Sequence, residues 1–103
     1  MDLKKNVIPA NVNTIHLTAV CGTGMGALAC MLKDMGYTIT GSDHKIYPPI
    51  SDFLFEKGIH VIENFHEDNL SHKPDLVIIG NAVTKNNPEA IQVTSMGLNF
   101  CSM

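Results

Sequence analysis

Residues 15–29, IHLTAVCGTGMGALA, run from an apolar strand through a glycine cluster into an amphipathic helix. Backbone N–H groups at a helix N-terminus have no partner within the helix and lie at the positive end of its dipole, so an anion fits there when side chains are small. Gly22, Gly24 and Gly26 keep that space open. The sequence therefore predicts a phosphate-binding turn between the first strand and the first helix.

The rest of the chain alternates predicted strands with predicted helices. The first strand is expected at residues 14–20, and the helix after it ends at Gly36. The pairs Pro48-Pro49 and Asn87-Pro88 predict the starts of two further helices, and one helical turn is expected within residues 63–73. The remaining strands are expected at residues 37–41, 59–62, 76–79 and 98–101. This alternation predicts an α/β fold with a Rossmann-like, doubly wound parallel sheet of about five strands.

Length and charge limit the possible functions. At 103 residues the chain is long enough for one core, so a single domain over residues 1–103 is expected. The formal net charge of -3 gives no general attraction to nucleic acid, and no apolar run approaches the ~20 residues that span a bilayer. The N-terminus lacks the apolar core of a signal peptide, which predicts a cytoplasmic protein. The three cysteines lack CxxC spacing, so neither a disulfide framework nor a zinc site is expected.

In doubly wound sheets a ligand binds outside the carboxyl ends of the strands, where the strand order reverses. The first, second and fourth predicted strands are followed by Cys21-Gly22, by Ser42-Asp43 and by residues 80–82, so these segments are expected to converge on one crevice. Asp43 lies roughly 20 residues beyond the glycine turn, where a carboxylate in a nucleotide-binding unit accepts hydrogen bonds from ribose hydroxyls. A nucleotide is therefore the expected ligand.

Other reactive side chains have simpler interpretations. His16 lies within the first strand and is expected to be a hydrogen-bonded core or sheet-edge histidine rather than a ligand. Cys21 lies near a helix N-terminus, but the sequence places no base beside it, so a packing role is expected. His44 adjoins the crevice and is a candidate for ligand contact. The histidine spacing suits no metal, and neither a metal site nor a catalytic residue is predicted. The methionines of the first helix are expected in the core: Met25, Met31 and Met35.

Four segments together resemble the N-terminal domain of the Mur ligases that use UDP-N-acetylmuramate. They are residues 16–29, residues 36–43 (GYTITGSD), residues 46–51 (IYPPIS) and residues 79–88 (IGNAVTKNNP). The last two, with Cys21 before the glycine turn, resemble the murein-recycling branch of the family more than the L-alanine-adding branch. The resemblance covers the chain from about His16 to its end. The family usually has glycine where Ala19 and Ala27 stand.

The resemblance implies a Rossmann-like domain that binds the UDP part of UDP-N-acetylmuramate. It implies that the diphosphate is wrapped by five residues of the glycine turn: Gly22, Thr23, Gly24, Met25 and Gly26. It further implies that Ser42 and Asp43 face the uridine ribose, and that Asn81 and Ala82 line the other side.

The family's central domain uses ATP and Mg²⁺ through a Gly-x-x-Gly-Lys-Thr/Ser loop, and its C-terminal domain binds the amino acid or peptide. This sequence contains neither Gly-Lys-Ser nor Gly-Lys-Thr. The chain is therefore expected to be the UDP-substrate domain of a longer ATP-dependent ligase of peptidoglycan synthesis or recycling, cut off after the fifth strand. Alone it would need no cofactor and would not be catalytic, and its partners would be UDP-N-acetylmuramate and the missing central and C-terminal domains.

Two other functions remain open at this point. Gly22-x-Gly24-x-x-Ala27 with Asp43 is also a loose dinucleotide fingerprint, which would suit the NAD(P)-binding domain of an oxidoreductase or a redox-sensing regulator. A domain that has lost its ligand and serves only structure or interaction is the third hypothesis.

Overall fold

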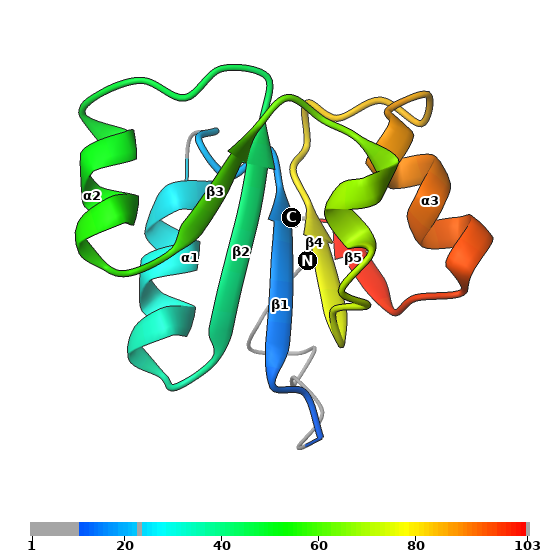
Figure 1. Ribbon diagram of the computed structural model, residues 1–103, viewed down its shortest axis with the longest axis horizontal. Helices are drawn as coiled ribbons and strands as arrows, with labels where there is room; N and C mark the ends of the chain where they lie inside the picture. Colours follow the sequence, from blue (N-terminus) through cyan, green and yellow to red (C-terminus); the bar gives the residue numbers. More distant parts are fainter. Residues whose placement is uncertain (1–10, 23, 103) are drawn as a thin grey trace.

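The computed structural model describes residues 11–22 and 24–102. Its centre is a five-stranded parallel sheet in the order β3-β2-β1-β4-β5 (Figure 1). The strands are β1 (Thr14–Thr18), β2 (Thr38–Asp43), β3 (His60–Glu63), β4 (Leu76–Ile79) and β5 (Phe100–Ser102). Between them lie α1 (Met25–Asp34), α2 (Ile50–Glu56), the 3-10 helix η1 (Glu67–Leu70) and α3 (Pro88–Met96). The predicted fold class is confirmed.

The helices cover both faces of the sheet. Helices α1 and α2 lie on one face, and η1 and α3 lie on the other (Figure 1). The larger core lies under α1 and α2, where Leu17, Leu32 and Leu54 are fully buried. A smaller core under η1 and α3 contains Leu70 and Val93. Because both faces are covered, β4 is apolar throughout, as a central parallel strand requires.

Helix α3 follows local sequence rules closely. Asn87 is its N-cap, and the Asn87 Oδ1 atom accepts a hydrogen bond of 2.9 Å from the Glu89 N–H. Pro88 occupies the first helical position, where no N–H partner is lost. Gly97 ends the helix with a φ of 67°, a conformation that glycine adopts without steric cost. The predicted start of this helix is confirmed.

The bounds of four predicted strands are wrong. Strands β3 and β5 are shifted by one or two residues from the predicted 59–62 and 98–101, and the errors in β1 and β2 bear on the crevice. Strand β1 ends at Thr18 rather than at residue 20, because Ala19 adopts a left-handed φ of 73° that turns the chain. Strand β2 continues past Gly41 to Asp43, because Ser42 still pairs with Thr18 on one side and with Ile62 on the other. Ser42 is therefore a residue of the sheet rather than of a loop.

The methionines of α1 divide between core and surface. Met25 is buried as predicted, but Met31 and Met35 are 45% and 61% exposed, so their predicted place in the core is wrong. The helix covers the sheet with its other face, through Ala29 and Leu32. Among the described residues, no helix has the length and apolar character needed to cross a membrane.

Candidate functional site

The turn between β1 and α1 leaves a helix N-terminus without a side-chain cap. Gly24 is the N-cap of α1 with a φ of 82°, and the Gly22 N–H donates to the Ala19 carbonyl over 3.0 Å. Within the described residues, no side chain caps this helix, and its first turn has no acidic residue. An anion could therefore bind here without displacing a carboxylate. Thr23, a predicted diphosphate contact, lies outside the described residues.

The residues of the turn differ in what they can offer a ligand. A Cβ at Gly26 would overlap the Ile50 side chain, so this glycine lets α1 approach α2 closely. The Met25 side chain is buried and its N–H donates to the Gly22 carbonyl over 3.0 Å, so its predicted contact with a diphosphate stays a prediction. Gly22 and Gly24 lie in the turn itself. The structure thus gives Gly26 a packing role, and its predicted contact with a diphosphate stays a prediction.

Asp43 joins the end of β2 to the glycine turn. Its Oδ2 atom accepts a hydrogen bond of 2.9 Å from the Cys21 N–H, and its Oδ1 atom accepts one of 2.7 Å from the His44 N–H. The residue is half-buried. A carboxylate has about four lone-pair sites, so Asp43 could accept further hydrogen bonds from a ligand while keeping both of these.

A small hollow of about 310 Å³ opens beside this carboxylate. It brings together two predicted site residues, Gly22 and Asp43, with His44, which was predicted to adjoin the crevice. Lys45 and Tyr47 also line it, and sequence reasoning did not assign either of them to the site. Both lie within a few residues of the end of the second predicted strand, and this position is the sequence signal that could have placed them at the site. Cys21 completes the lining.

Asn81 and Ala82 lie elsewhere. Both are exposed in the turn after β4, and neither lines the hollow beside Asp43. Gly80, just before them, is buried, and its N–H donates to the Thr18 carbonyl over 3.0 Å. The loop after β4 therefore begins next to the glycine turn, but the predicted ligand contacts of Asn81 and Ala82 stay predictions.

Cys21 is a packing residue, as predicted. It packs against the core under α1 and α2. Burial and the negative charge of Asp43 both raise the pKa of its thiol. A thiol that stays protonated at neutral pH is a poor nucleophile, so Cys21 is not suited to covalent catalysis.

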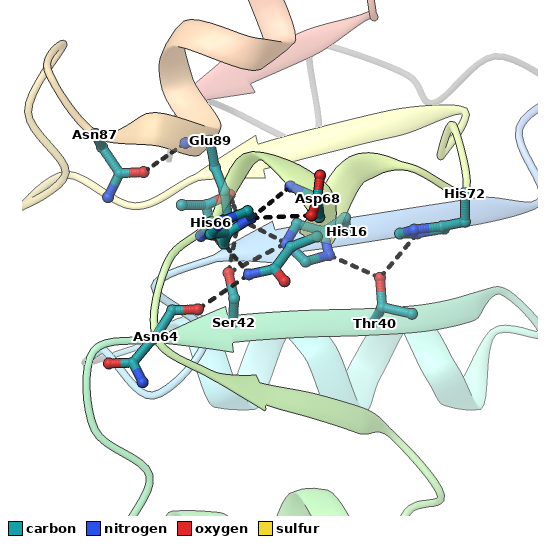
Figure 2. Close-up of polar contacts among 11 residues, drawn as sticks. His16, Thr40, Ser42, Asn64, His66, Asp68, His72, Asn87 and Glu89 are labelled. Atoms are coloured by element: carbon teal, nitrogen blue, oxygen red, sulfur yellow. Dashed lines mark hydrogen bonds and ion pairs between the residues drawn. The ribbon is translucent and has the colours of Figure 1, made fainter.

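Behind the crevice, the fully buried Glu89 carboxylate is the common acceptor of a polar cluster (Figure 2). The Glu89 Oε1 atom lies 2.8 Å from His16 Nε2, 2.9 Å from Thr18 Oγ1 and 2.7 Å from Ser42 Oγ. The Glu89 Oε2 atom accepts from Asn69 Nδ2 over 2.8 Å and from the His66 N–H over 3.3 Å. Five donors from β1, β2 and the η1 region thus converge on one carboxylate of α3.

This cluster explains the positions of Ser42 and His16. The Ser42 hydroxyl is buried against Glu89, so only the Ser42 backbone could reach a ligand, and its predicted contact with a ribose stays a prediction. His16 is a satisfied core histidine, as predicted. Its Nδ1 atom lies 2.8 Å from Thr40 Oγ1, which in turn lies 3.3 Å from Nε2 of the exposed His72. Sequence reasoning did not place Glu89 in the site and missed its role.

The environment of Glu89 keeps it ionised. Burial alone raises the pKa of a carboxyl group, but hydrogen bonds from His16, Asn69 and Ser42 and the attraction of His16 outweigh it, and the pKa of Glu89 lies below its ordinary value. Glu89 is also in the first turn of α3, where the helix dipole favours a negative charge. Among the described residues, no group of three or more His, Cys, Asp or Glu side chains is arranged to hold a metal ion.

Two larger hollows lie at the edges of the sheet. One of about 640 Å³ lies between α2 and β3, and the other, of about 650 Å³, lies between α3 and β5. Phe55 lines the first, and Ile91 and Phe100 line the second. Neither includes a residue of the glycine turn, and the crevice beside Asp43 remains the candidate nucleotide site.

Comparison with known proteins identifies the family. Residues 14–103 match the Mur ligase family, catalytic domain. The chain belongs to the Mur ligase family. This Mur ligase chain is 46% identical over 88 residues to the UDP-N-acetylmuramate–L-alanyl-gamma-D-glutamyl-meso-2,6-diaminoheptandioate ligase of Haemophilus influenzae. It is 32% identical over 92 residues to the UDP-N-acetylmuramate–L-alanine ligase of Vesicomyosocius okutanii. The predicted closer similarity to the recycling branch is confirmed.

A solved structure agrees with this assignment. The crystal structure of a murein peptide ligase from Psychrobacter arcticus superposes on this Mur ligase chain with a TM-score of 0.83 at 37% identity, covering 86% of this chain and 18% of that one. The matches to the two enzymes above cover 85% and 89% of this chain and 19% of each enzyme. The chain thus spans about a fifth of the length of the relatives it matches, and corresponds to their N-terminal domain.

Proposed function

We propose that this chain is the domain of a muropeptide ligase that binds the UDP part of UDP-N-acetylmuramate. The observation that carries the proposal is the hollow in which the Asp43 carboxylate and the glycine turn meet. The family membership and the names of the relatives, which are ligases of UDP-N-acetylmuramate, support it.

In this proposal each part of the hollow contacts a different part of the nucleotide. The diphosphate binds at the uncapped N-terminus of α1, where Gly22 and Gly24 have no side chains to cover the N–H groups of the first turn. Asp43 accepts hydrogen bonds from the ribose hydroxyls. Lys45, on the wall of the same hollow, adds a positive charge near the diphosphate, and Tyr47 offers an aromatic surface.

The ligation itself requires parts that we do not assign to this chain. We propose that the remaining domains of a longer cytoplasmic enzyme supply ATP, Mg²⁺ and the acceptor amine. There a carboxylate would be activated as an acyl phosphate and joined to the amine with loss of phosphate. The role of this chain is then to hold the UDP-sugar while those domains act.

Calorimetric titration of the 103-residue chain with UDP-N-acetylmuramate, UDP and NADH tests the proposal. We expect UDP-N-acetylmuramate and UDP to bind in preference to NADH. Preference for NADH would replace the proposal with an NAD(P)-binding domain, and binding of none of the three would favour a structural domain. Asp34→Asn is the matched control for substitutions of Asp43, because it removes one carboxylate charge at the far end of α1, where Asp34 pairs with Lys57 on the surface.

A further inference from the structure

We propose that Glu89 is a positioning residue for the nucleotide crevice, which it reaches through two hydrogen-bonded paths, one through Ser42, the residue before Asp43, to the glycine turn, and one to the Asp43 carbonyl. The inference rests on the proposed function, because the crevice is assigned to the UDP group. Glu89 itself is fully buried and does not line the hollow beside Asp43. Its effect on a ligand would therefore be indirect.

The first path runs through Ser42 to the glycine turn. The Ser42 hydroxyl donates to Glu89 Oε1 over 2.7 Å. The Ser42 carbonyl accepts hydrogen bonds from the N–H groups of Ala19 and Val20, over 2.9 Å and 3.0 Å. Glu89 thus fixes the residue that holds the start of the turn and directly precedes Asp43.

The second path runs through the loop after β3. Asn69 Nδ2 donates to Glu89 Oε2 over 2.8 Å and to the Asn64 carbonyl over 3.0 Å. The Asn64 N–H donates to the Asp43 carbonyl over 2.7 Å. Asn64 has a φ of 76°, a left-handed conformation that asparagine tolerates better than most residues. The second path therefore holds Asp43 from the side opposite the glycine turn.

The chemistry of the cluster requires a carboxylate at position 89. All five groups that contact the Glu89 oxygens are donors in this arrangement, because an ionised carboxylate can only accept. A glutamine amide would turn an N–H group toward one set of these donors and leave them without an acceptor. The Glu89 carboxylate satisfies all five donors only when β1, β2 and the η1 region keep their relative positions. The cluster therefore fixes the positions of these three regions.

The test compares substitutions on the two paths with one beside them. Glu89→Gln disturbs both paths, and Ser42→Ala and Asn69→Ala each interrupt one. Thr40→Val is the matched control, because it removes the hydroxyl that bridges His16 and His72 on the same face of the sheet and leaves both paths intact. We expect UDP to bind about tenfold more weakly to Glu89→Gln, and within about twofold of wild type to Thr40→Val.

A double substitution separates positioning from general loss of stability. If Glu89 acts through Asp43, Glu89→Gln should weaken UDP binding little further in a chain that already carries Asp43→Asn, while it should lower the melting temperature in both backgrounds. A full additional loss of affinity in the Asp43→Asn background would overturn the inference. So would unchanged affinity in Glu89→Gln, Ser42→Ala and Asn69→Ala alike.

Amide hydrogen exchange without ligand keeps the inference testable even if UDP does not bind and the proposed function fails. We expect the Cys21 and Asn64 amides to lose protection in Glu89→Gln relative to amides of β4, and to keep it in Thr40→Val. Equal loss of amide protection across the whole chain would show that Glu89 only stabilises the fold, and would overturn the proposal. If Glu89→Gln does not fold, Ser42→Ala and Asn69→Ala give the same readout one path at a time.

Discussion

The two faces of the sheet are built from the same strands and differ in chemistry. Toward α1 and α2, β1 presents Ile15 and Leu17, which are fully buried in an apolar core. Toward η1 and α3, β1 presents His16 and Thr18, which are equally buried but bonded to Glu89. We call these the apolar face and the polar face.

The difference shows how stability and positioning can be separated within one small domain. Apolar packing is not directional, so the apolar face stabilises the fold without fixing any one polar geometry. Hydrogen bonds to a buried carboxylate are directional and costly to leave unmade. On the polar face the parallel register sets Thr18 beside Ser42, and Ser42 directly precedes Asp43 of the crevice.

The largest effect is expected on the apolar face. Leu17→Ala should lower the free energy of unfolding by about 2–5 kcal/mol, because it removes buried methyl groups and leaves a cavity. Urea unfolding followed by circular dichroism measures the loss. Phe55→Ala, at a side chain 83% exposed, is the control and should change it by less than about 0.5 kcal/mol. A loss below about 1 kcal/mol for Leu17→Ala would contradict this view of the apolar face.

At the crevice, the expected effect is on binding rather than on folding. Asp43→Ala should weaken UDP binding by on the order of 1.5–3 kcal/mol, through lost charge-assisted hydrogen bonds and a less ordered glycine turn. Calorimetry measures this, with Asp34→Asn as the surface control. Unchanged affinity in Asp43→Ala would remove Asp43 from the site.

Acid should weaken the polar face. The folded pKa of Glu89 lies below its ordinary value of 4.5, so its ionisation stabilises the fold at pH values above about 4.5. That contribution should be lost as the pH falls from 4.5 through the folded pKa. Urea midpoints measured from pH 6 to pH 3 should therefore fall more steeply for the wild type than for Glu89→Gln. Parallel curves for the two proteins would show that Glu89 does not titrate in this way.

The smallest effect is expected in the turn itself. Ala19 has a φ of 73°, which is costly for alanine and free of steric cost for glycine. Ala19→Gly should raise the free energy of unfolding by about 0.5–1 kcal/mol, because relief of strain exceeds the added entropy of the unfolded chain. Thermal unfolding measures it, with Ala27→Gly on the exposed side of α1 as a control that should be neutral or destabilising. A loss of stability in Ala19→Gly would contradict the strain.

Local sequence patterns predicted the helices and strands whose bounds depend on residues near them in the chain. Strand β4 was predicted with the bounds it has, because its apolar run reports burial on both faces. The start of α3 was predicted from its cap and proline. The end of β2 was not, because its last residues stay in the sheet by pairing with β1 and β3, which no local pattern reveals.

Contacts within the candidate site could be predicted only for residues that the strand topology alone brings together. Gly22 and Asp43 meet because parallel strands β1 and β2 end at the same edge of the sheet. Glu89 was missed because a first-turn acid is ordinarily exposed, and its partners His16 and Ser42 lie 73 and 47 residues away in the sequence. The positions of Lys45 and Tyr47 depend on how the loop after β2 folds, which apolar periodicity does not specify.

An NMR titration of the isotopically labelled chain with UDP tests the central claim most directly, because it locates the ligand. We expect the largest amide shifts at Cys21, Gly22, Gly24, Asp43 and His44, around the hollow that joins the glycine turn to β2. Shifts concentrated instead at Ile91 and Phe100, in the hollow between α3 and β5, would contradict the assignment of the crevice. So would the absence of any shift at saturating UDP.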